Sequence, residues 1–255
     1  MIDQTDSEDQ VNALFFELSS DDRKRILSAL QDENLKLSDL SKRLDLTATE
    51  VFRHIQRLTE ALLIQRLPNG RYQLTSYARL VLTTSSPLGF IARYRAYFLD
   101  HDASLLPDEF RMRLAELSGG KMGTDLVESM NKTTEMLRDA HEKIDVMVDR
   151  GLTQHGEIVE QRLKEGVKVR FILQKSMLSS IKPSPRPRGQ PRPETRSIPR
   201  ICGTALLTEK VAAFGLQRND GKLSEAGFYG EDANFLKWVG DLFEHEWQKA
   251  SPWYA

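Results

Sequence analysis

Between residues 48 and 62, apolar side chains recur at the spacing of one helix face, and polar or basic residues stand between them. The apolar residues are Val51, Ile55, Leu58 and Leu62. Residues between them are expected to face solvent. Arginine, threonine, histidine and glutamine can bond base edges or phosphate oxygens of nucleic acid. The candidates for base contact are Thr49, Arg53 and His54, and those for phosphate contact are Gln56 and Arg57. The same pattern is also that of a solvated face on any amphipathic helix.

Two helical patterns separated by a very short connection must position these side chains. Leu37, Leu40 and Leu44 form an apolar stripe in the first pattern. The second begins with Thr47 and Glu50, which have the spacing of a capping box. Because only two residues separate the patterns, the helices must turn sharply against each other, which is typical of a helix-turn-helix. An earlier helix is predicted from Ser20, its N-cap, to Leu30.

A tight hairpin is predicted directly after the second helix. Strands are expected at Ile64–Leu67 and Tyr72–Leu74, joined by the turn Pro68-Asn69-Gly70. A helix-turn-helix followed by such a hairpin is typical of a winged helix. Asn69 and Arg71 then lie at the wing tip, where they are candidates for contact with the adjacent minor groove or backbone.

The segment after the wing is predicted to be mainly helical from Thr75 to about Leu99, with an interruption around residues 85–87. Its aromatic residues are Tyr77, Phe90, Tyr94, Tyr97 and Phe98. They are expected either to pack against the winged helix or to pair two copies of the chain. A further helical stretch follows residues 105–107 and ends at Gly119-Gly120.

The C-terminal half alternates between helical and strand patterns. The expected elements are a helix at 124–141, a strand at 144–148, a helix at 157–164, a strand at 167–173, a hairpin of 204–207 with 211–214, and a helix at 232–250. Strand, helix and strand within about thirty residues predict a parallel pair. Ligands bind by default at the carboxyl ends of such strands. The candidates for effector contact there are Asp149, Arg150, Gln174 and Lys175, although plain solvated strand ends are the simpler interpretation.

A proline-rich segment interrupts this half of the chain. Residues 181–200 hold six of the ten prolines and six basic residues against Glu194 alone. We expect an exposed, mobile loop because proline is excluded from helix and strand interiors. The loop is either a solubilising insertion or a weak, salt-sensitive attraction for nucleic acid.

Together these patterns predict an α+β chain with four parts. They are an acidic N-terminal segment at 1–19, a winged helix-turn-helix at 20–82, a helical connector or dimerisation segment at 83–122, and an α/β domain with a partly parallel sheet at 123–255.

Composition is compatible with this organisation. The chain has 255 residues and a formal net charge of -1, but charge is unevenly spread: residues 47–79 hold five arginines against two glutamates. The local field, not the total, attracts phosphate. No run approaches the roughly 18 apolar residues of a membrane span. The acidic start lacks the features of a signal peptide, and the lone Cys202 permits no internal disulfide, so we expect a cytoplasmic protein.

An enzymatic interpretation has less support. Phospholipase-D chemistry uses His-x-Lys-x₄-Asp, and His141, Lys143 and Asp149 miss that spacing by one residue. None of the five histidines pairs with another at helical spacing, so we expect no metal site, and no phosphate-binding glycine loop supports a nucleotide cofactor. The sequence predicts no cofactor and no enzyme activity.

Three segments resemble an archaeal regulator family. LSDLSKRLDLTATEVFRHIQRLTEALLIQRLPNGRYQLT is similar to an archaeal ArsR-like winged helix. RYRAYFLDHDASLLPDEFRMRLAEL and FYGEDANFLKWVGDLFEHEWQKA resemble the connector and C-terminal domain of methanogenesis regulators. The resemblance implies a dimeric transcription regulator with a non-catalytic, phospholipase-D-like domain that senses or assembles. The chain departs from it at Phe52, where a small polar residue is usual, and in lacking the cysteine pair of ArsR metal sensors.

The function expected from the sequence is that of a homodimeric, sequence-specific regulator that binds double-stranded DNA and has a C-terminal sensory or assembly domain. The alternatives are a phosphodiesterase-like enzyme with a DNA-targeting module, and an interaction scaffold that uses residues 90–98 and the terminal helix. The sequence specifies neither the operator nor the effector, nor whether binding represses or activates.

Overall fold

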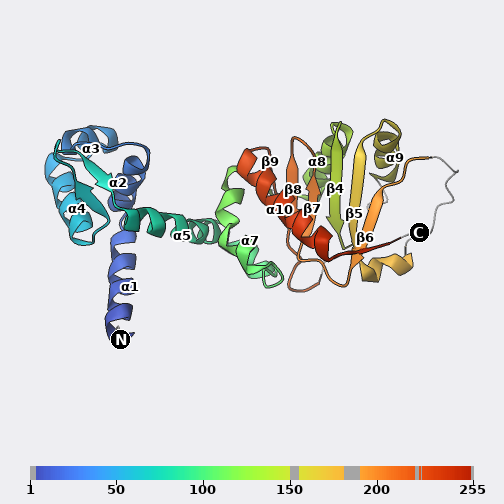
Figure 1. The fold of residues 1–255 in the computed structure, drawn as a ribbon, viewed down its shortest axis with the longest axis horizontal. Helices are drawn as coiled ribbons and strands as arrows, with labels where there is room; N and C mark the ends of the chain where they lie inside the picture. The colour runs from blue at the N-terminus through green and yellow to red at the C-terminus, as the bar shows by residue number, and fades with distance from the viewer. Residues whose placement is uncertain (1–3, 150–154, 181–189, 222–223, 225, 254–255) are drawn as a thin grey trace. The chain divides into compact units, whose positions relative to one another are not determined.

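The computed structural model describes residues 4–149, 155–180, 190–221, 224 and 226–253. It divides into two compact units, 1–86 and 87–255 (Figure 1). Among the described residues, no helix has the length and apolar character needed to cross a membrane.

The N-terminal unit is a winged helix preceded by an additional helix. Its elements are α1 (Gln4–Leu18), α2 (Asp21–Asp32), α3 (Leu37–Leu44), α4 (Ala48–Glu60), β1 (Ile64–Arg66), β2 (Tyr72–Leu74) and the first part of α5 (Ser76–Arg93). The stripe of α4 predicted from Val51, Ile55 and Leu58 is buried against α2 and α3. Leu62 does not belong to it, because it lies beyond the end of the helix and is 69% exposed.

Local signals in the sequence set the helix ends. Ser20 Oγ accepts a hydrogen bond from the backbone N–H of Arg23, which caps α2. At α4, Thr47 N–H donates to Glu50 Oε2 at 2.8 Å and Glu50 N–H donates to Thr47 Oγ1 at 3.3 Å. This is the predicted capping box, in which two otherwise unpaired backbone donors are satisfied reciprocally.

The wing is the predicted hairpin. β1 and β2 pair antiparallel, with Ile64 opposite Leu74, and Gly70 has φ +77 in the connecting turn. Glycine adopts this left-handed conformation without the strain that a Cβ introduces. A backbone bridge between Leu35 and Tyr72 joins β2 to the segment before α3.

The predicted interruption of α5 near residues 85–87 is wrong, because the helix continues through Pro87 to Arg93. A proline removes one backbone hydrogen bond from a helix. In the preceding turn, hydroxyl groups add bonds to helix carbonyls, including Thr83 Oγ1 to Arg79 O and Thr84 Oγ1 to Leu80 O, both at 2.9 Å. These hydroxyls bond other carbonyls than that of Thr83, which Pro87 leaves without its helix partner, so it is the buried position of Pro87 that favours a continuous helix.

The C-terminal unit contains a sheet covered on both faces. Its helices are α6 (Arg95–Asp100), α7 (Asp108–Met112), α8 (Leu126–Arg138), α9 (Gly156–Lys164) and α10 (Ala233–Lys249), with the short 3-10 helices η1 (Leu114–Gly119) and η3 (Lys175–Ser180). Its strands are β3 (Lys121–Gly123), β4 (Lys143–Val148), β5 (Lys168–Gln174), β6 (Glu194–Ile198), β7 (Thr204–Leu207), β8 (Ala212–Gly215), β9 (Gly227–Gly230) and β10 (Ser251–Pro252).

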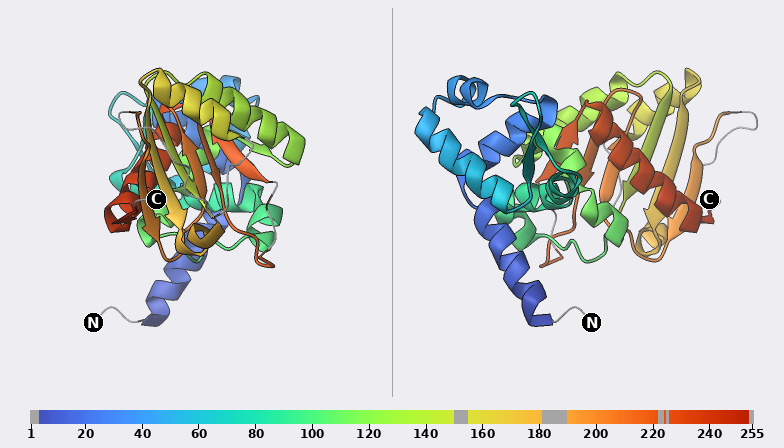
Figure 2. Two further views of the ribbon diagram at one scale, coloured as in Figure 1. Left: turned by 90° about the vertical axis from the view of Figure 1, so that its right-hand side faces the viewer. Right: turned by 60° about the vertical axis from the view of Figure 1, so that its left-hand side comes forward.

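The described strands form one sheet in the order β10-β6-β5-β4-β7-β8-β9-β3. β5 lies parallel to β4 and to β6, and the other pairs are antiparallel. In Figure 2, α10 covers one face, while α8 and α9 cover the other. The predicted partly parallel sheet and the β7–β8 hairpin are confirmed.

The aromatic residues of the connector pack inside the C-terminal unit. Phe90, Tyr94 and Tyr97 surround Phe228 of β9, with ring centroids 4.9–5.3 Å from that ring. Phe90 and Tyr97 are buried. The expectation that these three residues pack on the winged helix is therefore wrong, and the scaffold interpretation loses its aromatic surface at 90–98; Tyr77 of the same set stays exposed, and pairing of two copies stays a prediction. The sequence did not reveal the partner because Phe228 follows more than a hundred residues later.

The expectation of a loop throughout residues 181–200 is also wrong in part. Glu194–Ile198 forms β6, which pairs with both β5 and β10. Pro193 and Pro199 stand just outside the strand, so every residue within it retains a backbone donor. Residues 181–189 lie outside the described part of the chain.

Candidate nucleic-acid interface

One face of α4 is exposed over two turns. The exposed side chains on it are Thr49, Phe52, Arg53 and Gln56. Their spacing of i, i+3, i+4 and i+7 places them side by side on the helix. Arg53 makes no hydrogen bond or ion pair with a described residue, whereas the Gln56 amide donates to Glu60 Oε1 at 3.1 Å. The structure thus brings three of the predicted contact residues together and adds Phe52 to them.

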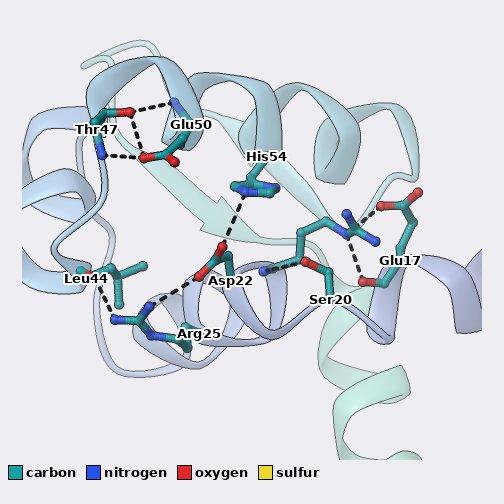
Figure 3. Close-up of polar contacts among 9 residues, drawn as sticks. Glu17, Ser20, Asp22, Arg25, Leu44, Thr47, Glu50 and His54 are labelled. Atoms are coloured by element: carbon teal, nitrogen blue, oxygen red, sulfur yellow. Dashed lines mark hydrogen bonds and ion pairs between the residues drawn. The ribbon is translucent and has the colours of Figure 1, made fainter.

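His54 does not lie on this face, and the prediction that it faces solvent is wrong. It is 7% exposed, and its Nε2 lies 3.7 Å from Asp22 Oδ2 on α2 (Figure 3). Burial lowers the pKa of His54, while the nearby Asp22 carboxylate opposes that shift. Position 54 is three residues after Val51 and four before Leu58, so the helical pattern itself places it near the buried stripe. The imidazole therefore belongs to the α2–α4 contact.

Glu50 serves the start of α4. Its carboxylate bonds both the hydroxyl and the backbone N–H of Thr47, and the bond with the hydroxyl is the largest cause of its lowered pKa. The ionised carboxylate lies at the positive end of the helix dipole, where negative charge is stabilised. Glu50 is thus held away from the outer face of the helix.

A buried carboxylate joins α1 to the other end of α4. Glu17 Oε1 lies 2.7 Å from Arg57 Nη2, although the two residues are 40 positions apart. Arg23 Nε lies 2.8 Å from Glu17 Oε2 and directs its hydrogen to the Glu17 carbonyl oxygen at 2.9 Å. Both guanidinium groups also lie over the ring of Phe16, at 4.9 and 5.5 Å. Sequence reasoning missed this cluster because no local pattern pairs residues so far apart.

A second network fixes the helix-turn-helix angle. Asp22 accepts from Arg25 Nη1 at 3.2 Å on one side and faces His54 on the other (Figure 3). The other Arg25 nitrogen, Nη2, donates to the carbonyl of Leu44 at the end of α3. One carboxylate and one guanidinium thus connect α2, α3 and α4.

The side chains of the wing-tip residues form hydrogen bonds with backbone groups of their own unit. Asn69 Oδ1 accepts from the backbone N–H of Arg71 at 3.1 Å, and Arg71 Nη1 donates to Asn34 O at 2.7 Å. Asn69 is exposed and Arg71 is half-buried. Arg66 on β1 is also exposed and was not among the predicted contact residues. Its position in a three-residue strand next to the turn was the available signal.

In the C-terminal unit, Gln174 is the last residue of β5, and Asp149 and Lys175 directly follow β4 and β5, whose ends are adjacent because Val148 is opposite Leu173. Asp149 accepts from Gln217 Nε2 at 3.2 Å. Gln174 Oε1 accepts from the backbone of Ile201 at 3.3 Å. These two hydrogen bonds tie the ends of β4 and β5 to the segments that contain Gln217 and Ile201. Arg150 lies outside the described residues.

The phosphodiesterase alternative requires His141, Lys143 and Asp149 to converge. Lys143 begins β4 and Asp149 follows its last residue, so they lie about 20 Å apart at the rise of a strand. Lys143 Nζ lies 3.8 Å from Asp145, and the backbone N–H of His141 donates to Glu209. The structure does not bring the three together. No cluster of metal-binding side chains occurs among the described residues.

No curated protein sequence matches this chain. Among solved structures, TrmBL2, an archaeal chromatin protein, is 18% identical, covers 88% of this chain and 91% of its own, and has a TM-score of 0.45. Reduced HlyU from Vibrio cholerae is 21% identical, covering 34% and 97%, with a TM-score of 0.30.

Nuc, a phospholipase D family member from Salmonella typhimurium, is 10% identical, covering 53% of this chain and 98% of its own, with a TM-score of 0.42. At these identities and TM-scores the three likenesses carry no conclusion about function. Residues 11–90 match the model of the N-terminal domain of the methanogenesis regulatory protein FilR1. This match supports similarity to a methanogenesis regulator over the segment that contains the winged helix. The resemblance of the connector and C-terminal segments to such regulators, and the ArsR-like and phospholipase-D-like parts, stay predictions.

Proposed function

We propose that this chain is a DNA-binding transcription regulator that inserts α4 into the major groove of duplex DNA. The observation that carries the proposal is the exposed face of α4, on which Arg53 has no hydrogen-bonding or ionic partner among the described residues. Its location in a segment that matches the N-terminal domain of a regulatory protein supports the same function. In a helix-turn-helix, the second helix reads base edges with its early residues.

The contact roles follow from position along α4 and the wing. Thr49 and Arg53 are the base-reading residues, because they lie in the first two turns of α4. Gln56 lies further along α4, and its proposed role is to contact a phosphate of the DNA backbone. Arg57 is 42% exposed while paired with Glu17, so it can meet a phosphate without leaving that carboxylate. Asn69 and Arg71 place the wing on the backbone or the minor groove, and His54 has no role in base contact.

We propose a homodimer, because two helices of the N-terminal unit carry apolar side chains that their own chain leaves uncovered. Val11 and Phe15 of α1 are 48% and 54% exposed, and Tyr77 and Leu80 of α5 are 46% and 64% exposed. Each pair has helical spacing and so forms one stripe. A second copy would bury these stripes, and Leu80→Glu is expected to yield a monomer in light scattering. Unchanged mass would exclude this interface.

The C-terminal unit has a sensory or assembly role in this proposal. Its support is topological, since Asp149 and Gln174 stand at adjacent ends of the parallel strands, where ligands bind in open α/β sheets. Lys175 follows at the start of η3, and Arg150 belongs to the same proposed site by sequence.

The test of the proposed function is selection of genomic duplex fragments by the full chain over a series of salt concentrations. A regulator should enrich a two-fold symmetric site, with affinity that falls as salt rises because phosphate contacts release counterions. Absence of binding, or equal binding to all fragments at every salt concentration, would contradict the proposal.

A further inference from the structure

We infer that Phe52 determines part of the DNA sequence preference by packing its ring against the C5-methyl group of a thymine in the major groove. This inference rests on the proposed function, because it requires α4 to enter the groove. The starting observation is that Phe52 is 57% exposed on a helix whose other large apolar residues, Val51, Ile55 and Leu58, are at most 3% exposed.

Among the described residues, the Phe52 ring joins no hydrophobic cluster and no aromatic pair. Phe52 belongs to neither the hydrophobic core of the N-terminal unit nor the partly buried residues packed on it, and no ring contact joins it to another described aromatic side chain. A scattered exposed apolar residue is ordinary on a protein surface. Phe52, however, lies between Thr49 and Gln56 and next to Arg53, on the one face of α4 that the fold leaves open.

The neighbouring charges select duplex DNA as the occupant of this face. Arg53 places a positive charge beside Phe52 and forms no hydrogen bond or close ion pair with a described residue, while the Glu50 carboxylate, whose pKa Arg53 helps to lower, is held at the helix start by Thr47. The positive charge attracts a polyanion to this face of α4. The Phe52 ring on the same face can be buried only against an apolar group of that polyanion. In the major groove, the thymine methyl group is the apolar feature that distinguishes one base from another.

The exchange of thymine for deoxyuridine removes only this methyl group and tests the contact directly. The experiment uses the site selected by the wild-type full chain and replaces each thymine in turn. Loss of one methyl contact is expected to weaken wild-type binding about fourfold at one position of the half-site. Phe52→Ala should bind the thymine and deoxyuridine duplexes equally there, whereas Phe52→Leu should retain part of the difference.

Leu99→Ala is the matched control, because Leu99 is an exposed apolar residue of the C-terminal unit (76%). It should keep the full wild-type preference for thymine. Phe52 is exposed, so its substitution should leave the thermal unfolding midpoint unchanged and an effect on binding cannot be assigned to misfolding.

Three results would overturn the inference. If the wild type binds a specific site but no thymine position responds to deoxyuridine, or if Phe52→Ala keeps the wild-type preference, the methyl contact is absent while the proposed function stands. If Phe52→Ala changes the oligomeric mass without DNA, a second copy covers the ring instead. If the wild type selects no duplex at all, the proposed function fails and this inference fails with it.

Discussion

At the residue scale, the side chains that hold α4 differ from those that extend outward from it. Glu17, Asp22 and Thr47 each contact a residue on α4 or at its start, and each comes from a different part of the chain. Arg53 and Phe52 point away from these contacts and remain exposed. The polar residues of α4 that look alike in the sequence thus divide into positioning residues, such as His54, and residues available to a partner.

Glu17→Ala should destabilise the N-terminal unit by about 2 kcal/mol, because it leaves the buried Arg23 and the half-buried Arg57 without their shared carboxylate. The free energy of unfolding in urea measures the effect. Glu8→Ala on the same helix is the matched control, since Glu8 is exposed and should change stability by less than about 0.5 kcal/mol. Equal stability of the two variants would show that the Glu17 cluster does not fasten α1 to α4.

At the element scale, short-range signals and the parallel pair β4–β5 were predicted from the sequence, whereas other long-range contacts were not. The Thr47–Glu50 capping box and the turn at Gly70 depend on residues within three positions of each other, so their patterns are visible in the sequence. The continuity of α5 depends on the burial of Pro87, and β6 depends on pairing with β5 and β10. Position 54 was ambiguous because it borders both faces of α4. The Glu17–Arg57 contact was not predictable from either residue alone.

The connection from α4 to the wing contains a strained residue. Leu62 has φ +58, and the bonds from Leu62 N–H to Thr59 O and from Leu63 N–H to Leu58 O close the helix end in a Schellman pattern. A residue with a Cβ is disfavoured in this left-handed conformation by roughly 1–2 kcal/mol, whereas glycine is not.

Leu62→Gly should therefore stabilise the protein, by about 1 kcal/mol, even though it deletes a large side chain. That side chain is 69% exposed, so little packing is lost. The midpoint of thermal unfolding should rise, and Leu62→Ala, which keeps the Cβ, should not reproduce the rise. Destabilisation by Leu62→Gly would mean that the leucine side chain makes a contact that outweighs the backbone strain.

At the scale of the whole molecule, each unit has its own core, and buried histidines occur in both. His54 lies in the N-terminal unit, and His101 and His155 lie in the C-terminal unit. Burial is the largest cause of the lowered pKa of all three. The folded protein therefore binds fewer protons at these sites than the unfolded chain does, once the pH falls toward the ordinary histidine pKa of 6.5.

Stability should therefore be complete above about pH 7 and fall as the pH is lowered through 6.5 toward the folded-state pKa values, because the unfolded chain gains protons first. Urea unfolding at pH 7.5 and pH 5.5 measures the loss. Substitution of the buried histidines by asparagine, one at a time, should reduce the difference between the two pH values. His141→Asn, at an exposed position, should leave the difference unchanged. A pH-independent wild type would contradict the burial of these imidazoles.

The most direct test of the central claim compares wild type, Arg53→Ala and Arg95→Ala on the selected duplex and on a scrambled duplex of equal length. Arg95 is an exposed arginine of α6 and serves as the charge-matched control. Loss of a two-bond guanine contact should weaken Arg53→Ala on the selected duplex by roughly 1–3 kcal/mol, about fivefold to 150-fold, with a much smaller change on the scrambled one. Arg95→Ala should match the wild type on both. Equal weakening of Arg53→Ala on the two duplexes, or none on either, would contradict the assignment of α4 as the element that reads DNA sequence.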